Sequence, residues 1–251
     1  MISDSMKKHR NFLKDDLRLQ INFQETDQNR GIAPPPVQKP IAPEQKKIAL
    51  PGRESFADYN GTDLVDAIRK RQSYRQFKRI PLNQSELGFL LWMTQGVRSE
   101  LQPGYALRSV PSAGCRHAFE TYILVSDIVD LYPGIYRYLP LDHALVLESA
   151  PDHLAERLTQ ATLNQNFIAA APVCFVWTAL PYRMEWRYDL AAHRVILLDA
   201  GHLCQNLYLA CEAIDAGTCA IAAYHQPLMD QLLEVDGEDE FTVYLAPVGK
   251  V

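Results

Sequence analysis

The sequence predicts an α+β domain of three layers, with a central sheet between two layers of helices. Segments rich in β-branched and aromatic residues, such as 119–125 (FETYILV) and 172–179 (PVCFVWTA), are typical of buried strands. Segments with apolar residues three and four positions apart, such as 191–216, indicate helices. Because some strands follow one another as hairpins and others are separated by helices, the order favours an α+β domain.

Two helices are expected near the start of the domain. Thr62 or Asp63 can cap a short helix that ends in a basic stretch. The next helix begins after Asn83, and Glu86 three positions later completes a capping-box pattern. We expect Gly96 to end this second helix in the left-handed conformation.

After these two helices, the sequence predicts further strands that alternate with further helices. The other strands are predicted within residues 134–148, 218–224 and 240–251. The other helices are predicted over residues 153–163, 191–216 and 226–235. The range 134–148 holds two strands joined by a Pro-Leu-Asp-His turn, and 218–224 is a short strand or an extended loop. The long helix should stop at Gly217. Its apolar character on several faces makes it a candidate subunit interface.

Residues 1–60 are expected to form an N-terminal arm, and residues 61–251 the globular domain. Proline recurs between Gly31 and Gly52 without a helical or alternating pattern, which predicts extended backbone. Such a stretch is either a disordered linker or an arm that lies on a surface, such as that of a partner subunit. Isolated apolar residues, Ile32 and Val37 among them, favour the second alternative.

Composition excludes several classes of protein. The net charge of -5 argues against nonspecific binding to nucleic acid. The first residues do not resemble a signal peptide, and no apolar run has the length of a membrane helix, so we expect a cytoplasmic protein without a membrane partner. Five cysteines without a C-x-x-C pair predict neither a metal site nor a disulfide framework.

Four separated segments carry candidate binding chemistry. Arg71, Ser73 and Arg75 alternate in RQSYR, so an extended turn can point all three at a terminal phosphate; the alternative is a solvated basic turn. Residues 111–114 (PSAG) let backbone approach a flat ligand, or form an ordinary turn.

The other two segments lie near the C-terminus. Residues 218–223, which carry no bulky side chain except Ile221, either expose backbone groups to the heteroatoms of a ring or form a packed strand. Lys250 either adds a cation to the phosphate or frays at the terminus. The sequence contains no G-x-G-x-x-G motif, Walker loop or nucleophile elbow, so a Rossmann nucleotide site is not supported.

Together these segments resemble the nitroreductase-like flavoproteins, and within them the SagB-type dehydrogenases, which include azoline oxidases of thiazole/oxazole peptide biosynthesis. The resemblance is carried by RQSYRQF, RSVPSAGCRHAFETYILV, GIYRYLPLDHAL, LDAGHLCQNLYLACEAIDAGTCAIAAY and DGEDEFTVYLAPVGK. It implies a nitroreductase-like three-layer sandwich, with a mainly antiparallel central sheet flanked by helices, in an interlocked homodimer that binds FMN between its subunits.

The resemblance also implies a function. The expected activity is FMN-dependent hydride transfer on a small or peptide-derived substrate, by a SagB-type dehydrogenase. One alternative is a general nitro or quinone reductase with NAD(P)H as transient electron donor. The other is a flavin-binding protein without turnover.

By this resemblance, each segment has a role toward FMN. The phosphate would be held by Arg71, Ser73, Arg75 and Lys250. The flavin would be approached from the other subunit by Pro111, Ser112, Ala113 and Gly114. Backbone groups near the ring would come from Ala220, Ile221, Ala222 and Ala223. Gln165 would lie near the ring or the ribityl chain.

Two positions depart from the pattern. Relatives often have glycine where Ala222 stands. Azoline oxidases carry a Lys-Tyr pair where this chain has Arg187 and Tyr188. Because arginine stays protonated, Tyr188 is the candidate for assisting proton transfer, with a packed core tyrosine as the alternative.

Overall fold

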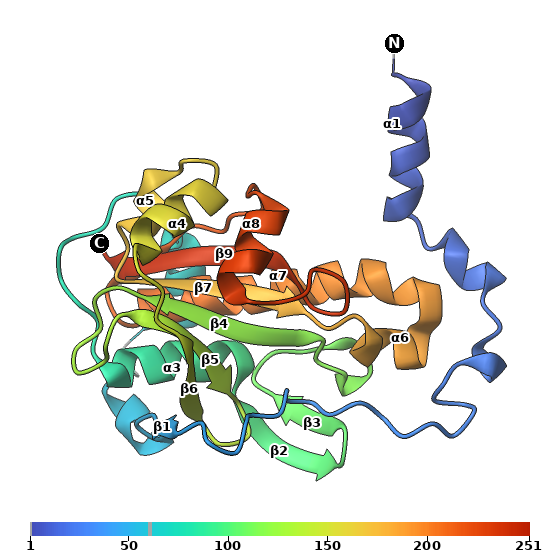
Figure 1. The fold of residues 1–251 in the computed structure, drawn as a ribbon, viewed down its shortest axis with the longest axis horizontal. Helices are drawn as coiled ribbons and strands as arrows, with labels where there is room; N and C mark the ends of the chain where they lie inside the picture. The colour runs from blue at the N-terminus through green and yellow to red at the C-terminus, as the bar shows by residue number, and fades with distance from the viewer. Residues whose placement is uncertain (1, 60–61) are drawn as a thin grey trace.

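Seven strands form one antiparallel sheet in the order β1-β6-β5-β4-β7-β9-β8 (Figure 1). The computed structural model describes residues 2–59 and 62–251. The strands of the sheet are β1 (Lys47–Ala49), β4 (Phe119–Val125), β5 (Gly134–Leu139), β6 (Ala144–Ser149), β7 (Val173–Ala179), β8 (Ala216–Thr218) and β9 (Phe241–Lys250). The long central strands β4, β7 and β9 match predicted strands, and β4 and β7 are buried as expected.

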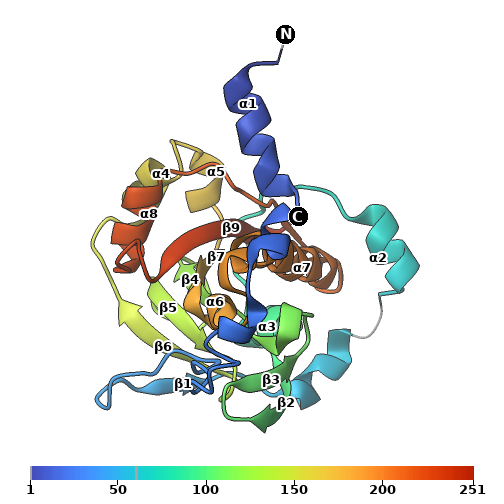
Figure 2. The same cartoon turned by 90° about the vertical axis from the view of Figure 1, so that its right-hand side faces the viewer.

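Helices cover both faces of this sheet (Figure 2). One layer contains α3 (Gln84–Gln95) and α7 (Ala192–Glu212), and the other contains α4 (Leu154–Ala161), α5 (Asn166–Ala169) and α8 (Gln226–Leu233). Side chains alternate along β4, so Ile123 packs in the core under α3 and α7 whereas Leu124 packs in the core under α4 and α8. The predicted three-layer α+β fold is therefore confirmed.

The start of the domain follows the predicted capping pattern. The Asp63 carboxylate accepts the first N–H groups of α2 (Leu64–Lys70). Asn83 and Glu86 form the complete capping box of α3. Two further helices are α1 (Asp4–His9) and α6 (Tyr182–Tyr188). Within the described part of the chain, no helix combines the length and apolar character needed to cross a bilayer.

Two details of the predicted helix ends are wrong, although α3 does end at Gln95, just before Gly96, as expected. Gly96 has φ -58, outside the left-handed region, and a Cβ there would lie 2.4 Å from the Trp92 ring. Close packing by Trp92, rather than a left-handed turn, therefore favours glycine at this position. The long helix ends at Glu212, before Gly217, which instead lies in β8. Asp215, with φ 51, takes the left-handed conformation in the turn between them.

A hairpin of β2 (Val97–Gln102) and β3 (Tyr105–Arg108) was not predicted. The pair stands outside the main sheet. Pro103 and Gly104 make its turn, and Gly104 has φ 81. The Pro-Gly dipeptide is the signal in the sequence that would have indicated this turn.

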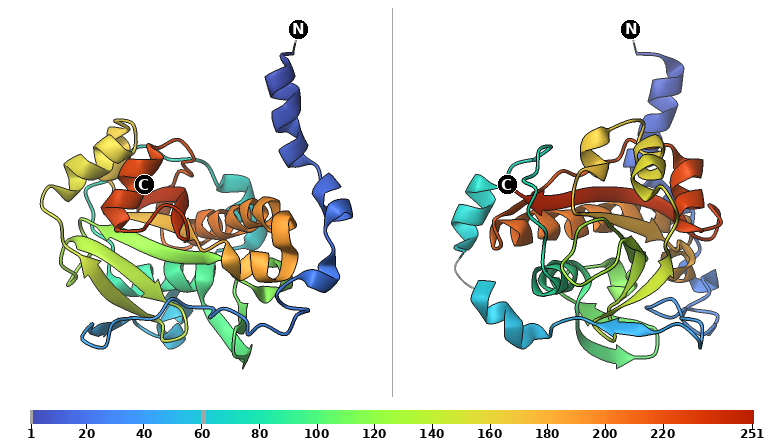
Figure 3. Two further views of the ribbon diagram at one scale, coloured as in Figure 1. Left: turned by 45° about the vertical axis from the view of Figure 1, so that its right-hand side comes forward. Right: turned by 60° about the vertical axis from the view of Figure 1, so that its left-hand side comes forward.

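The N-terminal region has two different parts. α1 projects from the body, as Figure 1 and the left-hand view of Figure 3 show. The following 3-10 segments are Arg10–Leu13, Asp16–Gln20 and Phe23–Glu25, with three more at Arg53–Tyr59, Ala113–Cys115 and Asp189–Ala191. Residues 32–50 pack against the globular domain of the same chain. Arg137 donates to the carbonyls of Lys39 and Pro40, both at 2.9 Å, and β1 pairs with β6. The predicted boundary at residues 60 and 61 lies outside the described residues.

A buried ion network fastens this proline-rich stretch to the sheet. The Glu120 carboxylate, on β4, is 2% exposed and forms ion pairs with Arg183 and Arg137. It also accepts the backbone N–H of Lys39 at 2.8 Å. Burial would raise the pKa of Glu120, but the two guanidinium groups outweigh burial and hold this pKa below its usual value.

Candidate functional site

Tyr208, on α7, joins two of the predicted binding segments. Its hydroxyl accepts the backbone N–H of Ala220 at 2.8 Å and lies 2.9 Å from Oγ of Ser73. The guanidinium carbon of Arg71 lies 5.1 Å from the centre of the Tyr208 ring, within range of a cation–π interaction. Residues that are about 150 positions apart in the chain therefore meet around one side chain.

The basic cluster divides into two pairs with different surroundings. Arg69 and Lys70 form ion pairs with Asp66, at 2.7 and 3.4 Å. Arg71 and Arg75 have no carboxylate partner among the residues that the structure describes. The solvated-face interpretation therefore suits the first pair, whereas the second pair retains two guanidinium groups with which to bind an anion.

The basic segment runs beside the C-terminal binding segment. Ser73 forms a parallel bridge with Thr218, and the N–H of Tyr74 donates to the Thr218 carbonyl at 2.9 Å. An open hollow of about 590 Å³ lies here, lined by residues 72–78 and Val251. Ser73 and Arg75 are exposed in this hollow, where a small anionic ligand can reach them.

Hydrogen bonds already occupy part of the loop formed by residues 220–223. Ile221 exchanges both of its backbone hydrogen bonds with Leu245, at 2.8 and 3.1 Å. The Ala223 carbonyl accepts Nε2 of Gln165 at 2.8 Å. The N–H groups of Ala222 and Ala223 have no acceptor in the described chain, and both residues are exposed. These two groups are the donors that the loop can offer to a ligand.

Lys250 differs from Arg71 and Arg75 because its ammonium group already has binding partners in the described structure. Its Nζ donates to Oε1 of Glu86 at 2.6 Å and to the Ile214 carbonyl, and its side chain is 17% exposed. The ammonium is thus already bound to a carboxylate at the end of β9. These contacts give no support to the expected phosphate role of Lys250.

The small-residue turn belongs to a second group of residues. The N–H of Ala113 donates to Oδ2 of Asp199 at 3.3 Å, and burial raises the pKa of Asp199. Gly114 has φ 58, and a Cβ there would lie 2.7 Å from the Tyr188 hydroxyl. Asp199 precedes Tyr208 by nine residues on α7, a separation of roughly 13 Å along the helix. Within one chain, the turn and Tyr188 are therefore displaced from the group around Tyr208.

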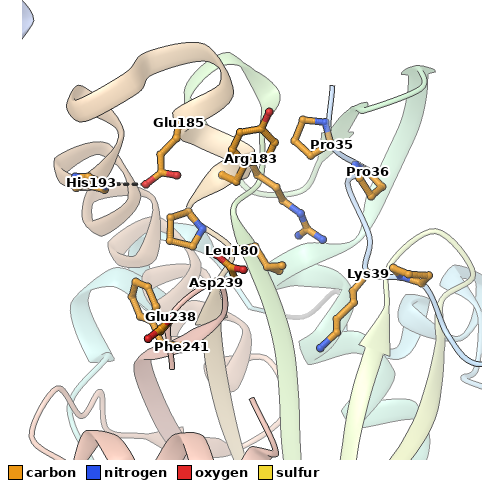
Figure 4. Close-up of a pocket in the computed structure, with 13 residues that line it drawn as sticks. Pro35, Pro36, Lys39, Leu180, Arg183, Glu185, His193, Glu238, Asp239 and Phe241 are labelled. Atoms are coloured by element: carbon orange, nitrogen blue, oxygen red, sulfur yellow. Dashed lines mark hydrogen bonds and ion pairs between the residues drawn. The ribbon is translucent and has the colours of Figure 1, made fainter. Parts of the chain in front are cut away.

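Another hollow, of about 640 Å³, lies between the proline-rich stretch, α6 and the start of β9 (Figure 4). Its walls are mainly apolar, with Pro35, Pro36 and Phe241 among them. Its charged groups are largely paired: Lys39 with Glu240 at 2.6 Å, and His193 with Glu185 at 2.8 Å. None of the residues predicted to bind a ligand lines this hollow.

Comparison with known proteins decides the family. The family model described as "Nitroreductase family" matches residues 68–250, which is most of the chain. A nitroreductase-like protein of Methanocaldococcus jannaschii is 31% identical over 193 residues, covering 77% of this chain and 93% of that protein. The chain belongs to the nitroreductase family.

Two further relatives extend the comparison. A solved structure of a nitroreductase-like protein from Ralstonia eutropha superimposes with a TM-score of 0.68 and 25% identity, covering 87% of this chain and 94% of that one. The trifolitoxin operon protein TfxC of Rhizobium leguminosarum is 24% identical over 217 residues, or 81% of this chain and 58% of TfxC. As a member of the nitroreductase family, the chain is an oxidoreductase.

The sequence-based prediction of the site in this nitroreductase-family chain missed Tyr208 and Asp199. Both residues lie on α7, where a helical pattern alone indicates only packing. One signal was available: a buried tyrosine hydroxyl usually has a hydrogen-bond partner, and Tyr208 stands in a largely apolar stretch. The partners themselves are distant in sequence and become visible only in the fold.

Proposed function

We propose that the chain is an FMN-dependent oxidoreductase of the SagB type that transfers hydride to or from a small or peptide-derived substrate. The observation that carries the proposal is the meeting of Arg71, Ser73 and the 220–223 loop around Tyr208. The sequence resemblance assigns the first two to a phosphate and the loop to a flavin ring, and the fold makes these segments neighbours.

The residues fit FMN by their chemistry. Two guanidinium groups that have no ion-pair partner among the described residues, beside a hydroxyl, suit a terminal phosphate. The N–H groups of Ala222 and Ala223 suit the acceptor atoms at the edge of a flavin ring. Bound FMN would supply the hydride chemistry. The chain would hold the phosphate, orient the ring, and place the Tyr188 hydroxyl to hold or move a proton.

A second copy of the chain completes this proposal. Leu197 and Leu198 on α7 are 47% and 55% exposed, and a Cβ on the neighbouring Gly201 would meet nothing within 4 Å. This open apolar face suits the close approach of another helix. In such a dimer, the turn containing Gly114 and the Tyr188 hydroxyl would serve the flavin held by the partner subunit.

Leu198→Arg is expected to shift the protein from dimer to monomer and to remove most bound FMN, because a charge would be buried at the helix contact. Sedimentation velocity, followed at protein and at visible flavin absorbance, measures both effects. Leu141→Arg is the matched control, because Leu141 is 42% exposed in the turn between β5 and β6. A Leu198→Arg monomer that keeps its flavin would contradict the shared site.

The assay for the proposed activity uses the purified protein. We expect it to be yellow, with about one FMN per chain, and we expect its flavin to be bleached by a reductant under nitrogen and restored by an acceptor. A colourless protein that takes up no FMN would contradict the proposal. Rapid NAD(P)H consumption with many nitro or quinone acceptors would favour a general reductase. Photoreduced flavin that no acceptor reoxidises would favour a binding protein without turnover.

The relationship to TfxC favours the SagB-type alternative over a general reductase. That relative takes its name from the trifolitoxin operon, and it matches 81% of this chain. A substrate that arises during the synthesis of a toxin or a related peptide product fits this relationship. The Arg187–Tyr188 pair departs from the azoline-oxidase pattern, so the exact substrate is proposed only at the level of a peptide-derived or small molecule.

A further inference from the structure

We propose that Tyr208 is a positioning residue that couples the phosphate-binding segment to the ring-binding loop and directs the Ser73 proton toward the phosphate. The inference rests on the proposed function, because it concerns the same FMN site. It assigns a role to a side chain that makes no expected contact with substrate.

The proposed direction of the hydrogen bonds starts from the Ala220 amide, whose role as donor is fixed. The Ala220 N–H can only donate, so the Tyr208 oxygen accepts this bond. Tyr208 has one hydroxyl proton, and Oγ of Ser73, at 2.9 Å, is the acceptor within reach among the described residues. We assign Tyr208 as the donor to Ser73 because this arrangement gives the Tyr208 proton a partner, and the Ser73 proton then remains available to another acceptor. A phosphate oxygen is such an acceptor.

The three donor groups in this series of hydrogen bonds, the Ala220 amide and the hydroxyls of Tyr208 and Ser73, then point the same way. The order runs from the Ala220 amide through Tyr208 to Ser73 and outward to the anion. Consecutive hydrogen bonds of this kind polarise one another, so each link strengthens the next. The phosphate would thus gain from Tyr208 without touching it.

The position of Tyr208 suits a rigid support. It is 9% exposed and lies on the 21-residue helix α7, whereas Ser73 and Ala220 lie in segments between regular elements. The ring of Tyr208 also lies under the guanidinium of Arg71. One side chain on a helix therefore sets the place of the cation, the hydroxyl and the first residue of the loop.

Tyr208→Phe isolates the hydroxyl, because the phenyl ring can still support Arg71. The experiment measures the affinity of flavin-free protein for FMN and for riboflavin, which lacks the phosphate. We expect FMN binding to weaken about 10-fold, the upper range for one ordinary hydrogen bond, because Ser73 loses the partner that directs its proton to the phosphate. Riboflavin binding should weaken much less. The preference for FMN over riboflavin should fall accordingly.

Two controls separate this role from a general structural one. Tyr136→Phe removes the hydroxyl of another buried tyrosine, which donates to the Tyr132 carbonyl at 2.8 Å, and should leave the flavin preference unchanged. Ser73→Ala should weaken FMN binding in the wild-type background and much less in the Tyr208→Phe background, because the two hydroxyls act as one unit.

The contradicting results are distinct. If Tyr208→Phe weakens FMN and riboflavin equally, or neither, the coupling is wrong while the proposed function stands. If the wild-type protein binds neither flavin, the proposed function fails. Amide hydrogen exchange of flavin-free protein gives an independent readout: the Ala220 amide should exchange faster in Tyr208→Phe than in wild type, and equal rates would also overturn the coupling.

Discussion

The double variant Arg71→Ala/Arg75→Ala is expected to fold normally and to bind FMN about 100- to 10,000-fold more weakly. Each hydrogen bond from a charged group contributes about 1.5 to 3 kcal/mol, so losing two removes about 3 to 6 kcal/mol. Neither arginine has a carboxylate partner in the described chain, so their removal leaves no buried charge behind. Visible absorbance of the purified protein and calorimetric titration with FMN measure the loss.

The same cluster provides a matched control. Arg69→Ala/Lys70→Ala removes two cations from the adjacent positions, but these cations are paired with Asp66. The control should retain FMN affinity to within a few-fold, because such exposed ion pairs contribute little. Equal losses in both double variants would mean that the total charge matters rather than a defined phosphate site. Wild-type affinity in Arg71→Ala/Arg75→Ala would show that the phosphate assignment is wrong.

Glu120→Ala is expected to lower the free energy of unfolding by about 3 to 5 kcal/mol, the usual effect of removing one member of a buried ion pair. The guanidinium groups of Arg183 and Arg137, each no more than 3% exposed, would lose this partner inside the protein. The Lys39 N–H would also lose its acceptor, so residues 32–50 should become easier to cleave. Urea unfolding and limited proteolysis measure the two effects.

Glu148→Ala is the control for this effect. Glu148 also pairs with Arg137, but it is 23% exposed and Arg137 would keep Glu120 as a partner, so we expect a smaller loss than in Glu120→Ala. The contribution of Glu120 should also depend on pH. Its pKa in the folded protein is below the ordinary value of 4.5, so its stabilisation is complete above pH 4.5 and is lost as the pH falls through the folded pKa. A deficit in Glu120→Ala that stays constant into the acid range would contradict this assignment.

Local patterns in the sequence predict much of the fold. The capping box at Asn83 and Glu86, and the continuous apolar strands β4 and β7, are dictated by neighbouring residues, and the structure has them as expected. The wrong conformation at Gly96 and the wrong end at Gly217 have a common cause. Glycine occurs both in left-handed turns and where packing leaves no room for a Cβ, and the sequence does not distinguish the two. The tertiary structure packs Trp92 against Gly96 and places Gly217 in β8.

The site is only partly predictable for a similar reason. Arg71, Ser73 and the 220–223 loop could be named from sequence, because their residue types suit a phosphate and a flat ring. Tyr208 could not, because its role depends on a fold that brings Ser73 and Ala220 to the same hydroxyl. Sequence also could not show that Asp66 forms ion pairs with Arg69 and Lys70, whereas Arg71 and Arg75 form none within the described part of the chain.

A crystal structure of the protein soaked with FMN tests the central claim most directly. We predict the phosphate against Arg71, Ser73 and Arg75, and the ring edge against the N–H groups of Ala222 and Ala223. FMN bound elsewhere, for example in the hollow beside Pro35 and Phe241, would contradict the account.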